Sequence, residues 1–346
     1  MGISDHNYQT TRRHRVNASG RDGALDWSEA SVLVTGGTGS FGNKFVEIML
    51  GRYRPRRLVV FSRDELKQSE MIACFNDPSL RFFVGDVRDQ ARLERAMHGV
   101  DVVFHAAALK QIPSCEYNPF EAIQTNVIGA ENVINAAIDA GVRRVVMISS
   151  DKAVNPINLY GATKLCAEKL FVQGNAYGYG RGTVFGVVRY GNVIGSRGSV
   201  IPIFATQRTS GTVTVTDPGM TRFWVRLEQG VAFAIRCAEL MGGGEIFVPK
   251  IPSMRILDLV EAVAPGCNVE VIGMRPGEKL HEVLIAEEES RQVLEFEDMF
   301  LLEPIYPSWA FRAAEGGKRP GAGFRYSSDT NTWWLSPAEM REFARE

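Results

Sequence analysis

The chain has 346 residues, of which 45% are hydrophobic and 23% charged, and 39 basic against 40 acidic residues leave a formal net charge of −1. This composition is typical of a globular protein with a substantial core, and the near-neutral charge argues against a nucleic-acid partner. The five cysteines are too widely spaced for a disulfide framework or a zinc site, and no apolar run reaches the roughly 20 residues of a membrane helix, so we expect a cytoplasmic protein without metal or membrane segment.

Residues 1–30 form a polar segment without the apolar core of a secretory signal. They contain Arg12, Arg13 and Arg15 but also Asp5 and Asp22, whereas organellar targeting peptides are poor in acidic residues. We therefore expect a flexible N-terminal tail.

Short β-branched runs alternate with segments of helical length from residue 31 onward. Continuous apolar strands separated by amphipathic helices are typical of a parallel sheet that is buried on both faces. The sequence therefore predicts an α/β fold with a doubly wound parallel sheet. The expected strands are residues 31–35, 57–61, 80–84, 101–105, 144–148 and 183–188.

The regular alternation ends near Tyr190, and glycine and proline then appear among shorter elements. This change predicts a smaller C-terminal substrate-binding lobe. Residues 245–248 and 268–272 are further candidate strands, the second of them in the lobe, and a last helix is expected from Ser336. The expected division is a tail over 1–30, a dinucleotide-binding domain over 31–192, a lobe with segments returning to the sheet over 193–303, and an extension over 304–346.

A glycine-rich turn follows the first expected strand. Gly37, Gly39 and Gly42 match the G-x-G-x-x-G pattern and precede a helical segment. Glycines let the backbone approach a pyrophosphate, and the helix N-terminus offers unpaired N–H groups. We expect a dinucleotide to contact Gly36, Thr38, Gly39, Ser40, Phe41 and Gly42.

The end of the second expected strand bears on the choice of cofactor. An NAD site places a carboxylate there to accept the ribose hydroxyls. Here a hydroxyl and two cations, Ser62, Arg63 and Lys67, favour the 2′-phosphate of NADP. Asp64 and Glu65 keep NAD as the less favoured alternative.

Tyr160 and Lys164 lie four residues apart in an expected helix after the fifth strand. Residues at this spacing are neighbours on one helix face. Because a nearby ammonium favours the phenolate, the pair is a candidate for taking a proton from a sugar hydroxyl. Asp151 and Lys152 lie just upstream, at the end of the fifth strand.

The chain from about residue 31 to 303 resembles the extended short-chain dehydrogenases/reductases, and within them the inverting UDP-N-acetylglucosamine 4,6-dehydratases of pseudaminic acid synthesis. The most specific stretch runs from Ser150 to Lys164, because most short-chain enzymes lack the Asp-Lys pair. Supporting matches are residues 62–65, 106–110, 189–193, 220–223 and 275–279.

This resemblance implies a route for removing water across C5 and C6 of the sugar. Oxidation at C4 comes first, since a C4 ketone makes the C5 proton removable. In that family hydride passes from C4 to the nicotinamide and later to C6, so the cofactor is recycled internally. The resemblance assigns the hydroxyl proton to Tyr160, the C5 proton to Lys152 and protonation of the leaving C6 hydroxyl to Asp151. An adjacent ion pair favours the opposite resting protonation states, which burial must offset.

The resemblance also implies further binding residues and an assembly. Additional cofactor contacts are expected at Asp86, Val87, Ala106, Ala107, Lys110 and Asn126. The substrate UDP-N-acetylglucosamine is expected to contact Lys110, Asn192, Val200, Ile201, Pro202, Arg222, Arg275 and Glu278. Relatives act in polysaccharide biosynthesis and flagellin glycosylation and form dimers or hexamers, so a homo-oligomer is expected.

Three alternatives remain at this point. The C5-retaining dehydratases share the Asp-Lys pair, but they commonly carry methionine in place of Tyr160 and have a transmembrane N-terminal region. A nucleotide-sugar 4-epimerase would use Tyr160 with NAD and leave Lys152 without a role. A non-catalytic NADP-binding regulatory protein would bind the cofactor but turn over no sugar nucleotide.

His105 ends an apolar strand and is expected to be a core residue.

Overall fold

The computed structural model describes residues 25–195, 200–307, 309, 311 and 314–344. Its centre is a nine-stranded sheet in the order β14-β15-β10-β6-β5-β4-β1-β2-β3, in which the strands from β10 to β3 are parallel and β14 and β15 are antiparallel additions. The strands are β1 Ser31–Thr35, β2 Arg57–Ser62, β3 Leu80–Val84, β4 Val102–His105, β5 Arg144–Ser150, β6 Val184–Tyr190, β10 Ile246–Pro249, β14 Val293–Glu295 and β15 Met299–Leu302.

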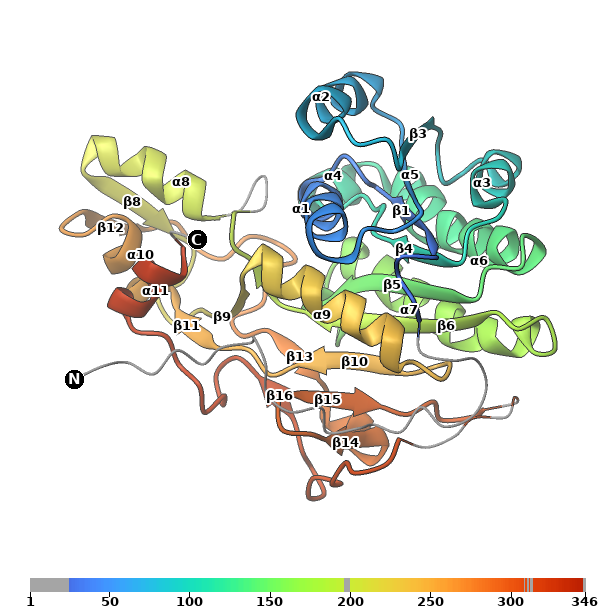
Figure 1. The fold of residues 1–346 in the computed structure, drawn as a ribbon. Helices are drawn as coiled ribbons and strands as arrows, with labels where there is room; N and C mark the ends of the chain where they lie inside the picture. The colour runs from blue at the N-terminus through green and yellow to red at the C-terminus, as the bar shows by residue number, and fades with distance from the viewer. Residues whose placement is uncertain (1–24, 196–199, 308, 310, 312–313, 345–346) are drawn as a thin grey trace.

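Helices cover both faces of this sheet (Figure 1). α1 packs on α9 along one face, whereas α3, α6 and α7 form the layer on the other. Strand order reverses between β1 and β4, which is the position where doubly wound sheets bind ligands beyond the carboxyl ends of the strands. The helices of this part are α1 Ser40–Ile48, α2 Glu65–Phe75, α3 Gln90–Met97, α4 Ile112–Tyr117, α5 Pro119–Ile123, α6 Gly129–Asp139, α7 Leu159–Gly178 and α9 Leu227–Leu240.

The smaller lobe has its own apolar core and lies beyond the carboxyl ends of the parallel strands (Figure 1). Its elements form three short sheets, β11-β9-β7, β12-β8 and β13-β16. They are β7 Asn192–Val193, α8 Val200–Gln207, β8 Thr212–Val215, β9 Thr221–Val225, β11 Ser253–Arg255, α10 Ile256–Val263, β12 Asn268–Val271, β13 Val283–Ile285, β16 Tyr326–Ser327 and α11 Pro337–Phe343.

The fold class predicted from the sequence is confirmed. All six expected strands of the parallel sheet are present, two with the expected bounds and four with ends that differ by one or two residues. β5 and β6 run two residues further than expected because Ser149 and Ser150 continue the ladder opposite Arg189 and Tyr190. The strand expected at 245–248 is β10, and the one expected at 268–272 is β12, paired with β8 in the lobe. The last helix begins after Ser336, whose hydroxyl caps it.

A buried ion-pair network fastens the sheet to the segment between β13 and β14. The side chain of Arg189 on β6 is fully buried between Glu168 on α7 and Glu289, at 2.7 and 2.8 Å from their oxygens, and it also donates to the carbonyl of Leu284 at 3.2 Å. Burial alone would lower the pKa of Arg189, but the two carboxylates raise it by more than burial lowers it. The guanidinium therefore stays charged.

Candidate active site

The glycine-rich turn requires the absence of side chains at several positions. Gly36 has a positive φ of 66°, and a Cβ there would lie 2.9 Å from the backbone of Ala107 at the end of β4. A Cβ on Gly42 would lie 2.2 Å from the carbonyl oxygen of Gly37. Gly39 begins α1 without a side-chain cap, so the first N–H groups of that helix face outward, as anion binding requires. The turn therefore fits a pyrophosphate.

The two cations expected at the end of β2 are already paired. Lys67 forms an ion pair with Asp64, which caps α2 by accepting from the backbone N–H of Lys67 at 3.0 Å. Arg63 is half exposed and lies 3.5 Å from a carboxylate oxygen of Asp86. The hydroxyl of Ser62 accepts from Gln68 at 3.1 Å. Asp64, one of the two acidic residues that keep NAD as an alternative, thus caps a helix.

The other expected cofactor residues surround the same edge of the sheet. Ala106 and Ala107 follow β4 against the glycine turn, and Val87 is buried next to Gly129 of α6. Lys110 is exposed, and partial burial lowers its pKa. Asn126 is buried and donates to the carbonyl of Leu109 at 2.8 Å and to the hydroxyl of Thr163 at 3.0 Å. Its amide therefore holds the loop after β4 against α7 and is itself enclosed by protein.

The candidate catalytic residues come together where β5 ends and α7 begins. Ser150 accepts from the backbone N–H of Lys152 at 3.1 Å, which starts the single 3-10 turn Asp151–Ala153. Asn158 caps α7 by accepting from Gly161 at 2.8 Å. A Cβ on Gly161 would lie 2.2 Å from the carbonyl oxygen of Lys152. This close backbone contact brings the first turn of α7 against the Asp-Lys turn.

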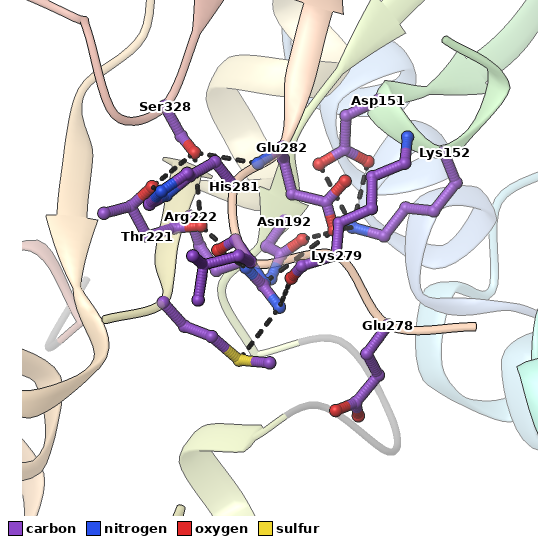
Figure 2. Close-up of polar contacts among 12 residues, drawn as sticks. Asp151, Lys152, Asn192, Thr221, Arg222, Glu278, Lys279, His281, Glu282 and Ser328 are labelled. Carbon is purple, nitrogen blue, oxygen red and sulfur yellow. Dashed lines mark hydrogen bonds and ion pairs between the residues drawn. The ribbon is translucent and has the colours of Figure 1, made fainter. Parts of the chain in front are cut away.

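Lys152 is the centre of a charged cluster (Figure 2). Its Nζ lies 2.9 Å from Oδ1 of Asp151, 2.8 Å from Oδ1 of Asn192 and 3.3 Å from Oε1 of Glu282. Glu282 also faces Arg222, with 3.8 Å between its Oε1 and the arginine Nε. Asp151 and Glu282 are buried, whereas 21% of the Lys152 side chain is exposed. The lysine side chain is therefore partly accessible, whereas the two carboxylates that it contacts are buried.

These contacts shift the ionisation of all three groups. Burial raises the pKa of Asp151, with Glu282 adding to the effect and Lys152 opposing it. Burial alone would lower the pKa of Lys152, but Asp151 and Glu282 together raise it above its ordinary value. Burial likewise raises the pKa of Glu282, yet Lys152 and Arg222 bring it below its ordinary value. The resting cluster therefore holds a charged lysine, a charged Glu282 and an Asp151 that takes a proton readily.

Tyr160 and Lys164 occupy the buried face of α7. Lys164 donates to the carbonyl of Ile148 at 2.6 Å, and burial lowers its pKa to about 8. Burial raises the pKa of Tyr160, while a hydrogen bond with Ser150 and the charge of Lys152 lower it. We expected Lys164 to stabilise the phenolate, but in the protein alone the ammonium that does so is that of Lys152.

The expected substrate residues divide into three groups. Arg275 is exposed and Glu278 half-buried, on a turn that the amide of Asn158 holds by donating to the carbonyl of Gly277 at 2.8 Å. In Figure 2 the carboxylate of Glu278 points away from the Lys152 cluster. Val200, Ile201 and Pro202 form the first turn of α8, and the first two pack on the lobe core.

Two of the expected substrate residues have different surroundings from those expected of diphosphate ligands. Arg222 donates from Nη1 to the carbonyls of Thr221 and Leu280, at 2.7 and 3.0 Å. Its Nη2 donates to the carbonyl of Lys279 at 2.9 Å and to Sδ of Met220 at 3.3 Å, and its Nε faces Glu282. Asn192 contacts Lys152. Both side chains therefore organise the Lys152 cluster, which the sequence motifs alone did not indicate.

Two charged residues of the site were not expected from the sequence. Glu282 directly precedes the buried strand β13, and Lys279 donates to the carbonyl of Val154 at 2.5 Å, just after the Asp-Lys turn. A carboxylate at the start of an apolar strand is the only local signal for Glu282. His105, by contrast, is the core residue expected: it is buried against Thr35, and burial lowers its pKa to about 3.

The chain is similar to known proteins over most of its length. Residues 32–304 match the family described as "Polysaccharide biosynthesis protein". The chain belongs to this family. It is 48% identical over 325 residues to the Campylobacter jejuni protein named UDP-N-acetylglucosamine 4,6-dehydratase (inverting), covering 91% of this chain and 97% of that protein. It is 44% identical over 328 residues, covering 91% and 95%, to a Rickettsia conorii protein named UDP-glucose 4-epimerase.

Solved structures give the same assignment. The structure of Pen from Bacillus thuringiensis superposes with a TM-score of 0.84 and 38% identity, covering 92% of this chain and 98% of that one. DesIV, a dTDP-glucose 4,6-dehydratase from Streptomyces venezuelae solved with NAD and TYD, superposes with a TM-score of 0.64 and 26% identity, covering 72% and 86%. These similarities confirm the resemblance to nucleotide-sugar 4,6-dehydratases of the extended short-chain type. Within the described part of the chain, every helix is too short or too polar to cross a bilayer.

Proposed function

We propose that the protein is a lyase that dehydrates UDP-N-acetylglucosamine to UDP-2-acetamido-2,6-dideoxy-β-L-arabino-hexos-4-ulose, with inversion at C5. The observation that carries this proposal is the cluster in which Lys152 and Asp151 lie beside Tyr160 at the carboxyl end of β5. An oxidoreductase that only exchanged hydride would need Tyr160 alone, whereas elimination needs a second acid and base. The 48% identity to an inverting dehydratase supports the same reaction.

The residues of the cluster have distinct tasks in this mechanism. A bound nicotinamide supplies the removal of hydride from C4 and its return at C6. Tyr160 takes the proton of the C4 hydroxyl, helped by the positive charge of Lys152. Once C4 is a ketone, Lys152 takes the C5 proton and Asp151 protonates the C6 hydroxyl, which leaves as water. Asn192 and Asp151 hold Lys152 in place for this step.

The resting ion pair becomes an acid and a base by one short proton transfer. Moving a proton from Nζ of Lys152 to Oδ2 of Asp151, which accepts its hydrogen bond at 3.1 Å, yields a neutral amine and a carboxylic acid. Burial of Asp151 favours this transfer because it raises the pKa of the carboxyl group. When the amine has taken the C5 proton and the acid has protonated the leaving hydroxyl, the original ion pair is restored. The pair therefore needs no outside proton for the elimination.

We infer that the cofactor is NADP. DesIV, with a similar fold, was solved with NAD, and a nicotinamide cofactor follows from the same glycine turn here. The preference for NADP rests on Arg63, Ser62 and Lys67, and Lys67 lines a cavity of about 220 Å³ together with Thr38 of the glycine turn. A 2′-phosphate in this region would compete with Asp64 for Lys67. Comparing the dissociation constants of NADP and NAD for the protein and for Arg63→Ala tests the preference, because only NADP binding is expected to weaken.

The substrate, pathway and assembly complete the proposal. Arg275 is the exposed cation best placed to take the diphosphate, with Glu278 beside it for the ribose. We place the product in pseudaminic acid synthesis for flagellin glycosylation, in the cytoplasm. A homo-oligomer, dimer or hexamer, is supported by the apolar side chains of Tyr117 and Phe120, which are 87% and 79% exposed on α4 and α5.

One experiment tests the function. The protein is incubated with UDP-N-acetylglucosamine in heavy water, and the products are followed by NMR. A 4-keto-6-deoxy product with deuterium at C5 and an L-configured ring is expected. A D-configured ring would indicate the retaining reaction, a 4-epimer without loss of water would indicate the epimerase named for the Rickettsia relative, and cofactor binding without turnover would indicate a regulatory protein.

A further inference from the structure

We propose that Glu282 is a positioning residue that holds Lys152 as an ammonium between two carboxylates until the C4 ketone has formed. This inference rests on the proposed function, since it concerns the timing of the base in that reaction. It assigns a task to the one buried carboxylate of the cluster that the mechanism above does not use.

The first support is the arrangement of charges around Lys152 (Figure 2). The ionisable groups that face it are Asp151 from the 3-10 turn, Tyr160 from α7, Arg222 from β9, and Lys279 and Glu282 from the segment before β13. Of these, only Asp151 and Glu282 are negative. Their oxygens lie 2.9 and 3.3 Å from the lysine Nζ, so each stabilises the ammonium directly.

The second support is the way in which the two carboxylate oxygens of Glu282 find partners. Its Oε1 contacts both Lys152 and Arg222, while its Oε2 is buried without a hydrogen-bond partner among the described residues. A carboxylate that merely held the fold together would direct both oxygens at donors. Glu282 instead places one oxygen between two cations and leaves the other without a donor, so its main interaction is electrostatic.

The third support is the rigidity of the backbone that carries it. The N–H of Glu282 donates to the hydroxyl of Ser328 at 2.9 Å, and its carbonyl accepts from the N–H of Ser328 at 2.8 Å and from the hydroxyl of Ser327 at 3.2 Å. Ser328 is in turn bonded to Thr221 on β9. Residues 327 and 328 of the C-terminal extension thus fix the carboxylate next to the lysine.

A charged Lys152 serves the first half of the cycle. Its ammonium lowers the pKa of Tyr160, whose phenolate is needed for oxidation at C4. It also cannot take a proton from C5 until its own proton has moved to Asp151. By favouring the ammonium, Glu282 therefore promotes oxidation at C4, the step that must come before elimination.

The test compares Glu282→Gln with Glu282→Asp and with Glu270→Gln, which alters an exposed glutamate on β12. The pH dependence of dehydration is measured for each. Because the reactive Asp151–Lys152 pair keeps one proton, the rate falls with pH as the pair loses that proton at the lysine pKa. Loss of the Glu282 charge lowers that pKa, so the falling limb of Glu282→Gln moves to lower pH by about one to three units. Glu270→Gln keeps the original limb. A lower rate with an unmoved limb in Glu282→Gln would overturn the proposal.

A second measurement needs no turnover. Lys152 of the cofactor-bound protein is acylated with acetic anhydride at fixed pH, and its labelling is read by peptide mass spectrometry. Glu282→Gln is expected to label about tenfold faster or more, because each unit of pKa multiplies the free amine by about ten. Glu282→Asp, whose charge lies one carbon further away, is expected to label faster by a smaller factor, and it serves alone if Glu282→Gln does not fold. Unchanged labelling would refute the role of Glu282, whereas altered labelling in a protein that turns over no UDP-N-acetylglucosamine would refute the proposed function only.

Discussion

Replacement of Lys152 by methionine removes the central charge of the site while keeping a side chain of similar length. The ammonium lies 2.9 and 3.3 Å from two buried carboxylates, and at an effective dielectric constant of 20 each attraction amounts to about 5 kcal/mol. Desolvation of the groups offsets much of this, and removing one partner of a buried pair typically costs about 3 to 5 kcal/mol. Because 21% of the lysine side chain is exposed, we expect a destabilisation near the lower value, about 3 kcal/mol.

The destabilisation caused by Lys152→Met should depend on pH in a defined direction. Without the ammonium, Asp151 and Glu282 repel each other and their folded-state pKa values rise above those of the unfolded chain. The folded variant then binds more protons than the unfolded one, so its stability falls as pH increases through the raised pKa values. The destabilisation relative to the wild type should therefore be smaller near pH 5 than near pH 8.

Denaturant unfolding at these two pH values measures the stability, and NMR of the sugar nucleotide measures the activity. Dehydration is expected to fall by about 10²- to 10⁴-fold, as for loss of a general base, with cofactor binding retained. Lys250→Met is the control, since Lys250 pairs at 2.8 Å with Glu295 on the edge strand β14, where both side chains are partly exposed. It should lose less than about 1 kcal/mol and no activity. Dehydration within tenfold of the wild type in Lys152→Met, or a destabilisation that grows toward pH 5, would refute the reasoning.

Three further substitutions test other parts of the structure. Tyr160→Phe should reduce C4 oxidation about 10²- to 10⁴-fold at nearly unchanged stability. Nicotinamide absorbance in single turnovers measures the oxidation. A variant that still reduces the cofactor at the wild-type rate would contradict the role of the phenol. Gly161→Ala places a Cβ 2.2 Å from the carbonyl of Lys152 and should displace the Asp-Lys turn, with a larger loss in kcat than in cofactor affinity; equal losses in both would contradict this. Arg189→Ala leaves Glu168 and Glu289 buried without their cation and should lower the free energy of unfolding by about 3 to 5 kcal/mol in denaturant titrations, whereas a loss below about 1 kcal/mol would show that the network is not needed.

The parallel sheet could be predicted from the sequence because its signals are local. Each strand from β1 to β6 is a short apolar run next to a helical segment, and the glycine turn follows the first of them directly. β14 and β15 were not predicted as strands. They are antiparallel additions at the edge of the sheet, where β15 pairs with β10, about fifty residues upstream, and no pattern within either segment indicates that pairing.

The catalytic cluster was predictable only in part for the same reason. Asp151, Lys152 and Tyr160 lie within one continuous motif, so their proximity follows from the end of β5 and the start of α7. Asn192 and Glu282 contact Lys152 from two other segments, and Arg222 contacts Glu282 from a third. Motif matches indicated that Asn192 and Arg222 matter, but the contacts that decide what they do depend on how the lobe packs on the sheet.

The hydrogen bonds between Glu282 and Ser328 affect the order in which the protein becomes competent during synthesis. The glycine turn and the strands around it are made early, and domains generally begin to fold from the N-terminal side as they emerge from the ribosome. Ser327 and Ser328 are translated long after Lys152, so the carboxylate beside that lysine is fixed in place late. A nascent chain can therefore form its nucleotide-binding half before its reaction centre is complete. Truncation upstream of β16 is expected to leave a protein that binds cofactor but turns over little UDP-N-acetylglucosamine.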